Sequence, residues 1–554
     1  MTCKIMRILF LTLLWFQLAT ADTYGVSSND NIVEIQRAVP VLIGKETVVS
    51  RIKVSGLQGK ILEGISVVWN DSKLTSPAME LRIYAAGNDS LYANDVKAEW
   101  KLFGRATSKI EAKKIAGNYA IAHPETYLYV TCLLAEPHRV GETFTFTVKR
   151  AQVDRKAQAV KQLNPVKYNT GIALREHMQD DIHTSRIPGL ARSNKGTLLA
   201  IFDARYESAR DLQGHMDIGL HRSEDSGETW QPIQIAMDMG EWGGLPQKFN
   251  GVSDACILVD AGSDAIYIAA TWMHGVLDDK GQWISNLTDT STVWNHQWRQ
   301  RGSQPGYDIK TSSQFLIVKS TDDGKTWGQP VNITAMGKQK DWWLWAPAPG
   351  NGISLSDGTL VMPTQGRDSS GKPFSNITYS KDGGATWHAS NPALRVEGGT
   401  TECAVVQLSN GDLMLNMRAN TNRNNMGNNN GRAVSVTADL GASWREHQTS
   451  FNALPEPTCM ASLVTHPYPL KCKTKHPLFF SNPNSKNKRH HMTIKASLDD
   501  GNSWPKSHQL LLDVGSSRGY SCIAPIDEQH IGILYESSQA GMVFQKIAIK
   551  DIIK

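Results

Sequence analysis

Ser223-Glu-Asp-Ser-Gly-Glu-Thr-Trp230 is the first of five copies of one eight-residue pattern, Ser/Thr-x-Asp-x-Gly-x-Ser/Thr-Trp. The other copies begin at Ser320, Ser380, Thr437 and Ser497, at intervals of roughly sixty residues after a longer first interval. In such a turn the aspartate accepts hydrogen bonds from the backbone, the glycine supplies a positive φ, and the tryptophan clamps the hairpin. The repeat therefore predicts a series of similar antiparallel units, each closed by the same structural turn.

A second repeat precedes three of these turns. A turn glycine begins a short apolar strand that ends at or near an arginine, in residues 196–205, 358–367 and 411–418. Each unit is therefore several strands long, and antiparallel modules of this size repeated around an axis form the blades of a β-propeller. The five turns and a further strand at residues 531–536 predict six blades, which we expect over residues 171–554.

The part of the chain that precedes the repeats has a different pattern. Four stretches alternate between apolar and polar side chains, as half-buried strands do: residues 66–69, 79–84, 127–131 and 143–148. We expect a small β-sandwich over residues 22–150 and a linker with a short helix over residues 151–170. The predicted fold class is thus all-β, with a six-bladed β-propeller preceded by a small β-sandwich domain.

The composition is that of an ordinary globular protein. Of 554 residues, 40% are hydrophobic and 20% are charged, and 58 basic against 53 acidic side chains leave a net charge of +5. Because this excess is small, it argues against a nucleic-acid binder and fits a mildly anionic ligand. The cysteines are far apart and form no CxxC pair, so the sequence predicts neither a disulfide framework nor a cysteine zinc site.

Residues 1–21 are expected to be a signal peptide. Lys4 and Arg7 precede an apolar run over residues 8–18, and Ala19-Thr-Ala21 gives the small-residue pattern of a cleavage site. The apolar run is shorter than the ~20 residues that span a bilayer, which argues against a membrane anchor. We therefore expect the mature protein to be exported to the periplasm, the cell surface or the medium.

The five turns resemble the Asp boxes of the sialidase superfamily, and Arg186-Ile-Pro188 resembles the Arg-Ile-Pro signature that precedes the first box in that family. The resemblance covers residues 170–554 and implies an exo-alpha-sialidase (neuraminidase), a glycoside hydrolase that removes terminal sialic acids from glycans, glycoproteins or glycolipids. With it we expect a monomer with no cofactor, no metal at the site, no nucleic-acid partner and no membrane span. Residues 66–150 more loosely resemble the lectin-like, carbohydrate-binding sandwich of some secreted bacterial sialidases.

The carboxylate of sialic acid, on its anomeric carbon, is best held by arginine, because a planar guanidinium donates two parallel hydrogen bonds to it. The resemblance places three such arginines at Arg186, Arg418 and Arg489, each on a different unit. Glu536 matches the carboxylate that orients the first of them. The alternative for each arginine is a solvated charge at a strand end. Each charge-assisted hydrogen bond contributes roughly 1.5–3 kcal/mol, so loss of one arginine should severely weaken substrate binding.

The nucleophile must approach a carbon that already bears a carboxylate, so a neutral phenol is favoured over a carboxylate, and sialidases are the tyrosine exception among glycosidases. The resemblance places this nucleophile at Tyr520 and its base at Glu402, since a phenol with a pKa of ~10 needs a base. It places the acid and later base at Asp211. Arg205 and Asp254 match residues around the 4-hydroxyl and N-acyl substituents. The implied reaction is hydrolysis with retention through a tyrosyl-linked intermediate.

Two other functions stay open on the sequence. A catalytically silent sialoside-binding propeller needs the arginines but no nucleophile, so Tyr520, Glu402 and Asp211 together favour the enzyme. A trans-sialidase, which delivers the sialate to a sugar hydroxyl or intramolecularly to the sialate's own hydroxyl, would use the same motifs. The tryptophan-rich segment 273–310 fits either an aromatic wall near the aglycone or an extra hairpin.

Overall fold

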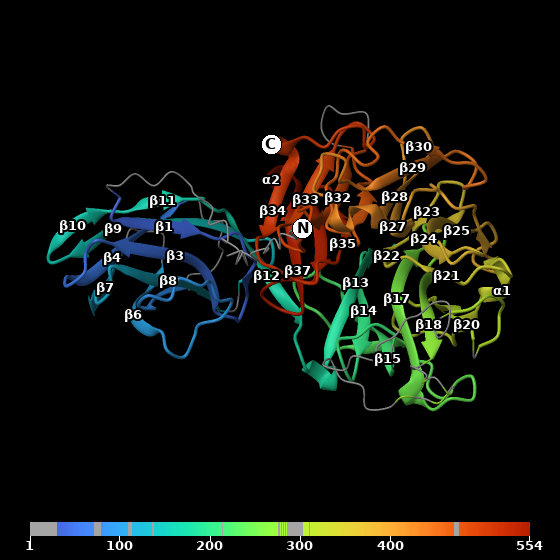
Figure 1. Ribbon diagram of the computed structural model, residues 1–554, viewed down its shortest axis with the longest axis horizontal. Helices are drawn as coiled ribbons and strands as arrows, with labels where there is room; N and C mark the ends of the chain where they lie inside the picture. The colour runs from blue at the N-terminus through green and yellow to red at the C-terminus, as the bar shows by residue number, and fades with distance from the viewer. Residues whose placement is uncertain are drawn as a thin grey trace, which may run out of the picture.

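The computed structural model is built almost entirely of β-strands (Figure 1). It describes residues 30–70, 79–108, 113–135, 138–212, 214–274, 303–309, 311–469 and 476–554, with single residues at 278, 280, 282 and 284. The predicted signal peptide and most of the segment 273–310 lie outside the described residues. Among the described residues, no helix is both long and apolar enough to cross a bilayer.

Six antiparallel units of four strands form the larger part of the molecule, which confirms the predicted six-bladed propeller (Figure 1). Blade 1 contains β13 (Thr184–Arg192), β14 (Leu198–Arg205), β15 (Met216–Ser223) and β16 (Gln234–Met237). Blade 2 contains β17 (Asn250–Val259), β18 (Ile266–His274), β19 (Gln314–Ser320) and β20 (Val331–Asn332). Blade 3 contains β21 (Leu344–Pro347), β24 (Leu360–Arg367), β25 (Pro373–Ser380) and β26 (His388–Ala389), with the short β23 (Ile353–Ser354) on β24. The short β22 (Gly350–Asn351) pairs with β17 of blade 2.

The remaining blades follow in chain order, except that the last one is completed by a strand from before the first. Blade 4 contains β27 (Thr400–Gln407), β28 (Leu413–Ala419), β29 (Ala433–Thr437) and β30 (Arg445–Glu446). Blade 5 contains β31 (Ser462–Thr465), β32 (Leu478–Pro483), β33 (Met492–Ser497) and β34 (Gln509–Asp513). Blade 6 contains β35 (Ser521–Asp527), β36 (His530–Tyr535), β37 (Met542–Ala548) and β12 (Tyr168–Arg175). Short helices α1 (Thr334–Gly337) and α2 (Ile549–Ile552) lie at the periphery.

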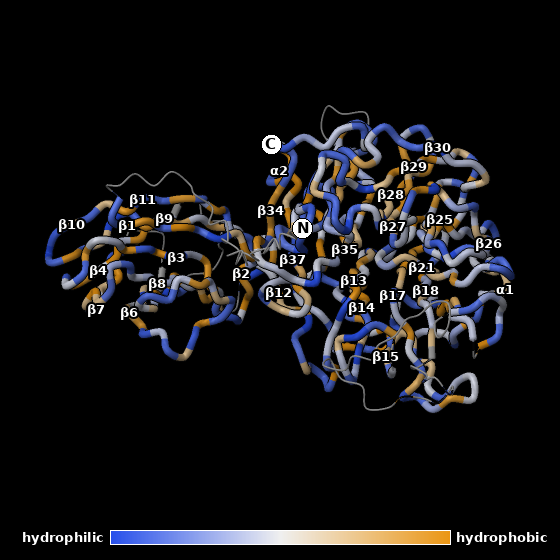
Figure 2. The backbone as a smooth tube through the Cα atoms, in the orientation of Figure 1, coloured by the Kyte–Doolittle hydropathy of each residue, from blue (hydrophilic) through white to orange (hydrophobic). Residues whose placement is uncertain are grey.

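Apolar packing between neighbouring blades forms the core of the propeller. Six clusters of buried apolar side chains are each shared by two adjacent blades, including the pair formed by the last and the first blade. Figure 2 shows hydrophobic residues along the strands and hydrophilic residues in the connecting segments. Burial of apolar area between blades therefore drives ring assembly.

The eight-residue turns connect the third and fourth strands of the first five blades. In the turn after β25, Asp382 accepts hydrogen bonds from the Thr386 backbone nitrogen at 2.9 Å and from its hydroxyl at 2.6 Å. These bonds lower the pKa of Asp382 to about 2. Gly384 in the same turn has φ +81°, and a Cβ there would lie 2.7 Å from the ring of Tyr267 in the preceding blade. The turn therefore also fixes the contact between blades.

The ring closes through β12. Ile172 of β12 pairs with Phe544 of β37, so a strand from before the first blade becomes the outer strand of the last. The same strand pairs with the sandwich: Tyr168 lies opposite Phe144, and Thr170 lies opposite Val41. One strand thus belongs to both parts of the molecule (Figure 1).

Two further sheets form the N-terminal part. One has the order β11-β1-β3-β8-β5-β6, and the other joins β9, β4 and β7 to β12, with β10 on β9 and β2 on β12. The strands are β1 (Ile32–Gln36), β2 (Val41–Leu42), β3 (Thr47–Ser55), β4 (Ile61–Asn70), β5 (Met79–Ala85), β6 (Lys101–Ser108), β7 (Lys113–Ala120), β8 (Glu125–Leu134), β9 (Thr143–Val153), β10 (Lys156–Ala159) and β11 (Lys161–Leu163). The four predicted strands fall within β4, β5, β8 and β9. The exact domain boundaries stay a prediction.

The segment 151–170 does not contain the predicted linker helix. It holds the end of β9, then β10 and β11, and the start of β12. Lys161 and Leu163 of β11 pair in parallel with Val33 and Ile35, so the segment completes the sandwich before it enters the propeller. An edge strand has few apolar side chains, so the polar and small residues of this segment are as typical of a linker as of a strand.

Replacement of Gly384 by alanine should destabilise the protein more than replacement of its neighbour Gly383. Both residues have positive φ, but a Cβ at Gly383 meets nothing within 4 Å, whereas one at Gly384 overlaps the Tyr267 ring. The overlap should cost about 1–3 kcal/mol beyond the shared backbone penalty. Thermal unfolding of the two variants measures the difference, and equal midpoints would contradict the contact.

Candidate active site

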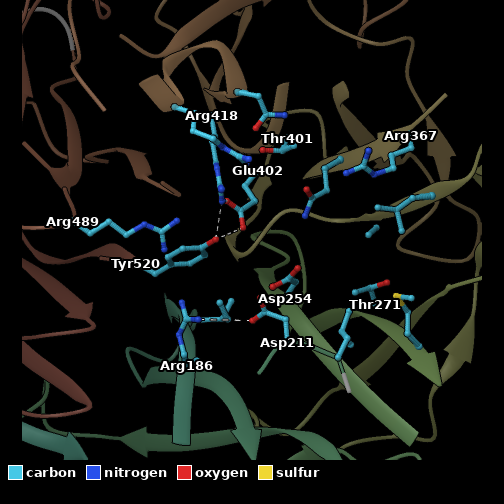
Figure 3. Close-up of a pocket in the computed structure, with 18 residues that line it drawn as sticks. Arg186, Asp211, Asp254, Thr271, Arg367, Thr401, Glu402, Arg418, Arg489 and Tyr520 are labelled. Atoms are coloured by element: carbon cyan, nitrogen blue, oxygen red, sulfur yellow. Dashed lines mark hydrogen bonds and ion pairs between the residues drawn. The ribbon is translucent and has the colours of Figure 1, made fainter. Parts of the chain in front are cut away.

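A cavity of about 360 Å³ opens where the first strands of the blades meet (Figure 3). Its polar lining comes from all six blades and the loops that belong to them: Arg186, Asp211, Asp254, Thr271, Gln365, Arg367, Thr401, Glu402, Arg418, Asn420, Arg423, Arg489 and Tyr520. Seven of the nine predicted site residues are in this set. The other two, Arg205 and Glu536, are buried behind it.

Bulges in the innermost strands place several of these side chains at the cavity. The pairing register shifts next to Arg186 in β13, across Asp254 in β17, and across Glu402 in β27. Asp254 also has a left-handed φ of 57°. A β-bulge bends a strand and redirects a side chain, and such features are frequent next to functional sites. The same irregularity in three blades therefore turns side chains from the blade surface toward one cavity.

Glu536, directly after β36, holds Arg186 in place. Its Oε1 accepts a hydrogen bond from Arg186 Nε at 2.8 Å and another from the Ile187 backbone nitrogen at 3.2 Å. Its Oε2 accepts one from the Tyr520 backbone nitrogen at 2.9 Å. Burial would raise the pKa of Glu536, but the charge of Arg186 and the hydrogen bonds to this carboxylate together outweigh burial, so the pKa is lowered. An ionised Glu536 thus joins the first and last blades under the cavity.

Tyr520 lies between two charged partners. Its hydroxyl donates a hydrogen bond to Glu402, and Arg418 Nη1 contacts both the Glu402 carboxylate at 2.5 Å and the Tyr520 hydroxyl at 3.1 Å (Figure 3). Burial, together with the charge of Glu402, raises the pKa of Tyr520 well above its usual value. The phenol is therefore un-ionised at neutral pH and has a carboxylate in position to accept its proton.

Three guanidinium groups surround the Tyr520 ring. Those of Arg186 and Arg489 lie 5.3 Å and 5.5 Å from its centroid, and Arg418 contacts its hydroxyl. Backbone carbonyls fix Arg489: its guanidinium group donates to the carbonyl oxygen of Arg518 at 2.9 Å and to that of Thr458 at 3.1 Å. The predicted convergence of the arginines is therefore present. Their combined charge favours a carboxylate ligand at this point.

Asp211 lies opposite Tyr520, in the loop between β14 and β15 (Figure 3). Its side chain is 66% exposed, and its Oδ1 accepts a hydrogen bond from Arg205 at 2.6 Å and lies 3.8 Å from Arg186 Nη1. Arg205, which we expected to contact a substituent of the substrate, does not line the cavity. It is buried and also bonded to Asp203 at 2.8 Å, because the loop folds over it. Arg205 thus positions the exposed carboxyl of Asp211.

Asp254 faces the cavity from β17. Its backbone nitrogen donates to Asp203 at 3.1 Å. Burial, with the charges of Asp203 and Glu402, raises the pKa of Asp254 well above its usual range. A carboxyl held toward its neutral form can donate a hydrogen bond as well as accept one, which suits recognition of a hydroxyl or an amide.

Six polar residues of the cavity were not predicted from the sequence: Thr271, Gln365, Arg367, Thr401, Asn420 and Arg423. Arg367 had a signal, since it ends the second copy of the strand repeat just as Arg418 ends the third. Arg423 and Asn420 lie in a turn over Asn420–Asn424, where composition indicates only a loop. These two residues add a positive charge and an amide group to the cavity lining.

A buried ion pair supports the strand end that carries Arg418. Glu456 accepts hydrogen bonds from the Ala419 backbone nitrogen at 2.7 Å, from Asn422 at 2.8 Å and from Arg432 at 2.6 Å. Both charged side chains are fully buried. Because three donors converge on one carboxylate, Glu456 fixes the direction in which the chain leaves β28.

Replacement of Glu456 by glutamine should lower the free energy of unfolding by about 3–5 kcal/mol, because it leaves Arg432 as an unpaired buried charge. Asp412→Asn is the matched control: it breaks an ion pair at 3.0 Å to Arg445, whose side chain is 68% exposed, and should cost less than ~1 kcal/mol. Urea unfolding measures both values. Similar costs for the two variants would show that Glu456 has no such supporting role.

Residues 187–503 match the family of BNR repeat-like domains. A sialidase of Bacteroides fragilis is 36% identical over 96% of this chain and 96% of its own length. The solved structure of the Hadza microbial sialidase Hz136 has 33% identity and a TM-score of 0.83, and the match covers 94% of this chain and all of that one.

A more distant solved structure shares the fold alone. It is the intramolecular trans-sialidase from Ruminococcus gnavus in complex with oseltamivir carboxylate, with 16% identity and a TM-score of 0.51. The match covers 69% of this chain and 99% of that one.

Proposed function

We propose that this chain, which belongs to the sialidase family, is a retaining exo-alpha-sialidase with Tyr520 as its nucleophile. Membership makes it a glycoside hydrolase that cleaves sialic acid from glycans. The observation that carries the finer proposal is the Tyr520 hydroxyl bonded to Glu402 and ringed by three guanidinium groups. A phenol with a base, placed inside an anion site, matches a substrate whose reacting carbon bears a carboxylate.

The arginines bind this carboxylate. Arg186 and Arg489 are held from behind, by Glu536 and by backbone carbonyls, so their outer nitrogens can face the cavity. A site that is fixed before the substrate arrives loses little side-chain entropy on binding. The carboxylate is thus held over the Tyr520 ring, and the anomeric carbon lies toward the hydroxyl.

The reaction then proceeds in two steps. In the first, the Tyr520 oxygen bonds to the anomeric carbon, Glu402 takes its proton, and Asp211 protonates the glycosidic oxygen as that bond breaks. In the second, Asp211 takes a proton from water, the water oxygen bonds to the anomeric carbon, and Tyr520 leaves with a proton from Glu402. Two displacements give net retention. Asp254 is placed to hydrogen-bond a ring substituent.

Replacement of Tyr520 by phenylalanine should reduce kcat for sialyllactose by about a thousandfold or more, because the nucleophile is lost. Tyr168→Phe is the matched control, since it removes a buried tyrosine hydroxyl whose bond to the Val49 carbonyl, 2.9 Å, lies in the sandwich. Sialic acid release and circular dichroism measure activity and folding. Full activity of the Tyr520 variant would refute its role.

Asp211→Asn should show a loss that depends on the leaving group. Sialyllactose needs a proton on its departing oxygen, so its cleavage should fall about 10²–10⁴-fold. A sialoside of 4-methylumbelliferone leaves readily without that proton, so its first step should fall much less. The pre-steady-state release of fluorophore measures this difference. An equal loss on both substrates would assign Asp211 another role.

The alternatives are separated by the products. A silent sialoside-binding propeller would release no sialic acid, but the pairing of Tyr520 with Glu402 favours an enzyme, since binding alone needs no activated phenol. Proton NMR of the first product distinguishes α-sialic acid from a sialylated acceptor or an intramolecular anhydro product. We expect free α-sialic acid first, which also tests retention.

We also propose that the chain acts outside the cytoplasm as a monomer. The support is the charged, apolar and small-residue pattern of residues 1–21. N-terminal sequencing of the exported protein should begin at Asp22, and an intact N-terminus would contradict the cleavage. The resemblance of the sandwich to lectin-like domains supports a role in holding glycans near the propeller.

A further inference from the structure

His215, Asp217 and Asp238 gather on blade 1, apart from the residues that line the cavity around Tyr520. His215 directly precedes the strand β15, Asp217 lies within it, and Asp238 follows β16. Each offers one nitrogen or oxygen atom, and the three atoms lie within 4.8 Å of one another. The reaction described above uses none of them.

Two atoms of this cluster are buried and have no hydrogen-bond partner in the described part of the chain. They are Oδ1 of Asp217, whose side chain is only 4% exposed, and Nε2 of His215, which has only an ion-pair contact with the other oxygen of Asp217. Buried polar atoms in native proteins nearly always have a partner, and a bound ion is one explanation for an exception. A buried carboxylate beside a buried imidazole nitrogen therefore indicates a cation that both can bind.

The spacing fits such an ion. His215 Nε2 lies 3.3 Å from Asp217 Oδ2. Two ligands that hold Zn²⁺ tetrahedrally at about 2.0–2.1 Å lie about 3.3 Å apart, so this pair has the length of one edge of the coordination tetrahedron. Asp238 is exposed and accepts hydrogen bonds from the Gly240 backbone nitrogen at 2.7 Å and from Gln247, and its carboxylate offers the third ligand atom within 4.8 Å of the other two.

A neighbouring tyrosine orients two of the ligands. The Tyr206 hydroxyl donates a hydrogen bond to Asp217 Oδ2 at 2.8 Å, and its ring stacks on His215 with centroids 4.1 Å apart. Metal-binding histidines and carboxylates are usually held by partners of this kind, which fix their direction before the ion arrives. Tyr206 lies directly after β14, at the other end of the loop that carries Asp211.

We propose that His215, Asp217 and Asp238 bind one divalent transition-metal ion, with zinc as the best match and water completing its coordination. An imidazole nitrogen with carboxylate oxygens suits zinc, whereas calcium and magnesium prefer oxygen ligands alone. The doubly charged ion neutralises both carboxylates. It fastens the ends of the 206–217 segment, which carries Asp211, and it stabilises the folded enzyme without contact with the substrate.

The test is zinc binding to the full chain, purified without a histidine tag and stripped with EDTA. Calorimetric titration with zinc chloride should give one site per chain, and zinc should raise the thermal unfolding midpoint. His215→Ala and Asp238→Asn should each weaken binding about a hundredfold or more. Asp238 is exposed, so its variant tests the site even if the His215 variant folds poorly.

His530→Ala is the matched control. It removes another partly exposed histidine that contacts an aspartate, Asp527, at 2.8 Å, but the described residues supply no third ligand there. This variant should bind zinc as the unchanged protein does. Absence of saturable binding to the unchanged protein would overturn the proposal, and so would binding that survives both the His215 and Asp238 substitutions.

Discussion

Ring closure is the constraint on which the site depends. The pairing of β12 with β37 joins the last blade to a strand from before the first, and Glu536 crosses the same junction to reach Arg186. Residues that are 350 positions apart become hydrogen-bonded neighbours there. If the ring opened, the guanidinium group of blade 1 would separate from the tyrosine that precedes blade 6. The stability of the fold and the geometry of the cavity therefore rest on one junction.

The cavity brings like charges together, and its anions make this arrangement stable. Glu536 accompanies Arg186, and Glu402 accompanies Arg418, both at distances at which the pairs are hydrogen-bonded. Arg489 is held by backbone carbonyls instead, which satisfy its donors without cancelling its charge. The cavity therefore keeps a net attraction for an anion. Burial, together with the charge of Glu402, keeps the phenol of Tyr520 un-ionised at neutral pH.

Repetition made the fold predictable. The eight-residue turn recurs because each blade packs against its neighbours in the same way, so the repeat predicted six blades. The alternation of apolar and polar residues predicted the strands of the N-terminal part. The site was predicted through motifs that resemble a family, and seven of nine residues line one cavity. Arg205 does not line the cavity as predicted, because the fold of a loop places it in contact with Asp203 and Asp211. The polar stretch 151–170 departs because an edge strand carries little apolar signal.

The sequence alone determined the repeating turn and the number of blades, because both are set by residue type and spacing. It supplied the candidate site residues only through motifs that resemble a family. Only the tertiary structure decided that β12 serves both parts of the molecule, that bulges turn Asp254 and Glu402 into the cavity, and that Tyr206 aligns His215 with Asp217. Such features depend on contacts between segments distant in the chain. No local pattern of residues records those contacts, since they arise when the ring closes and the blades pack.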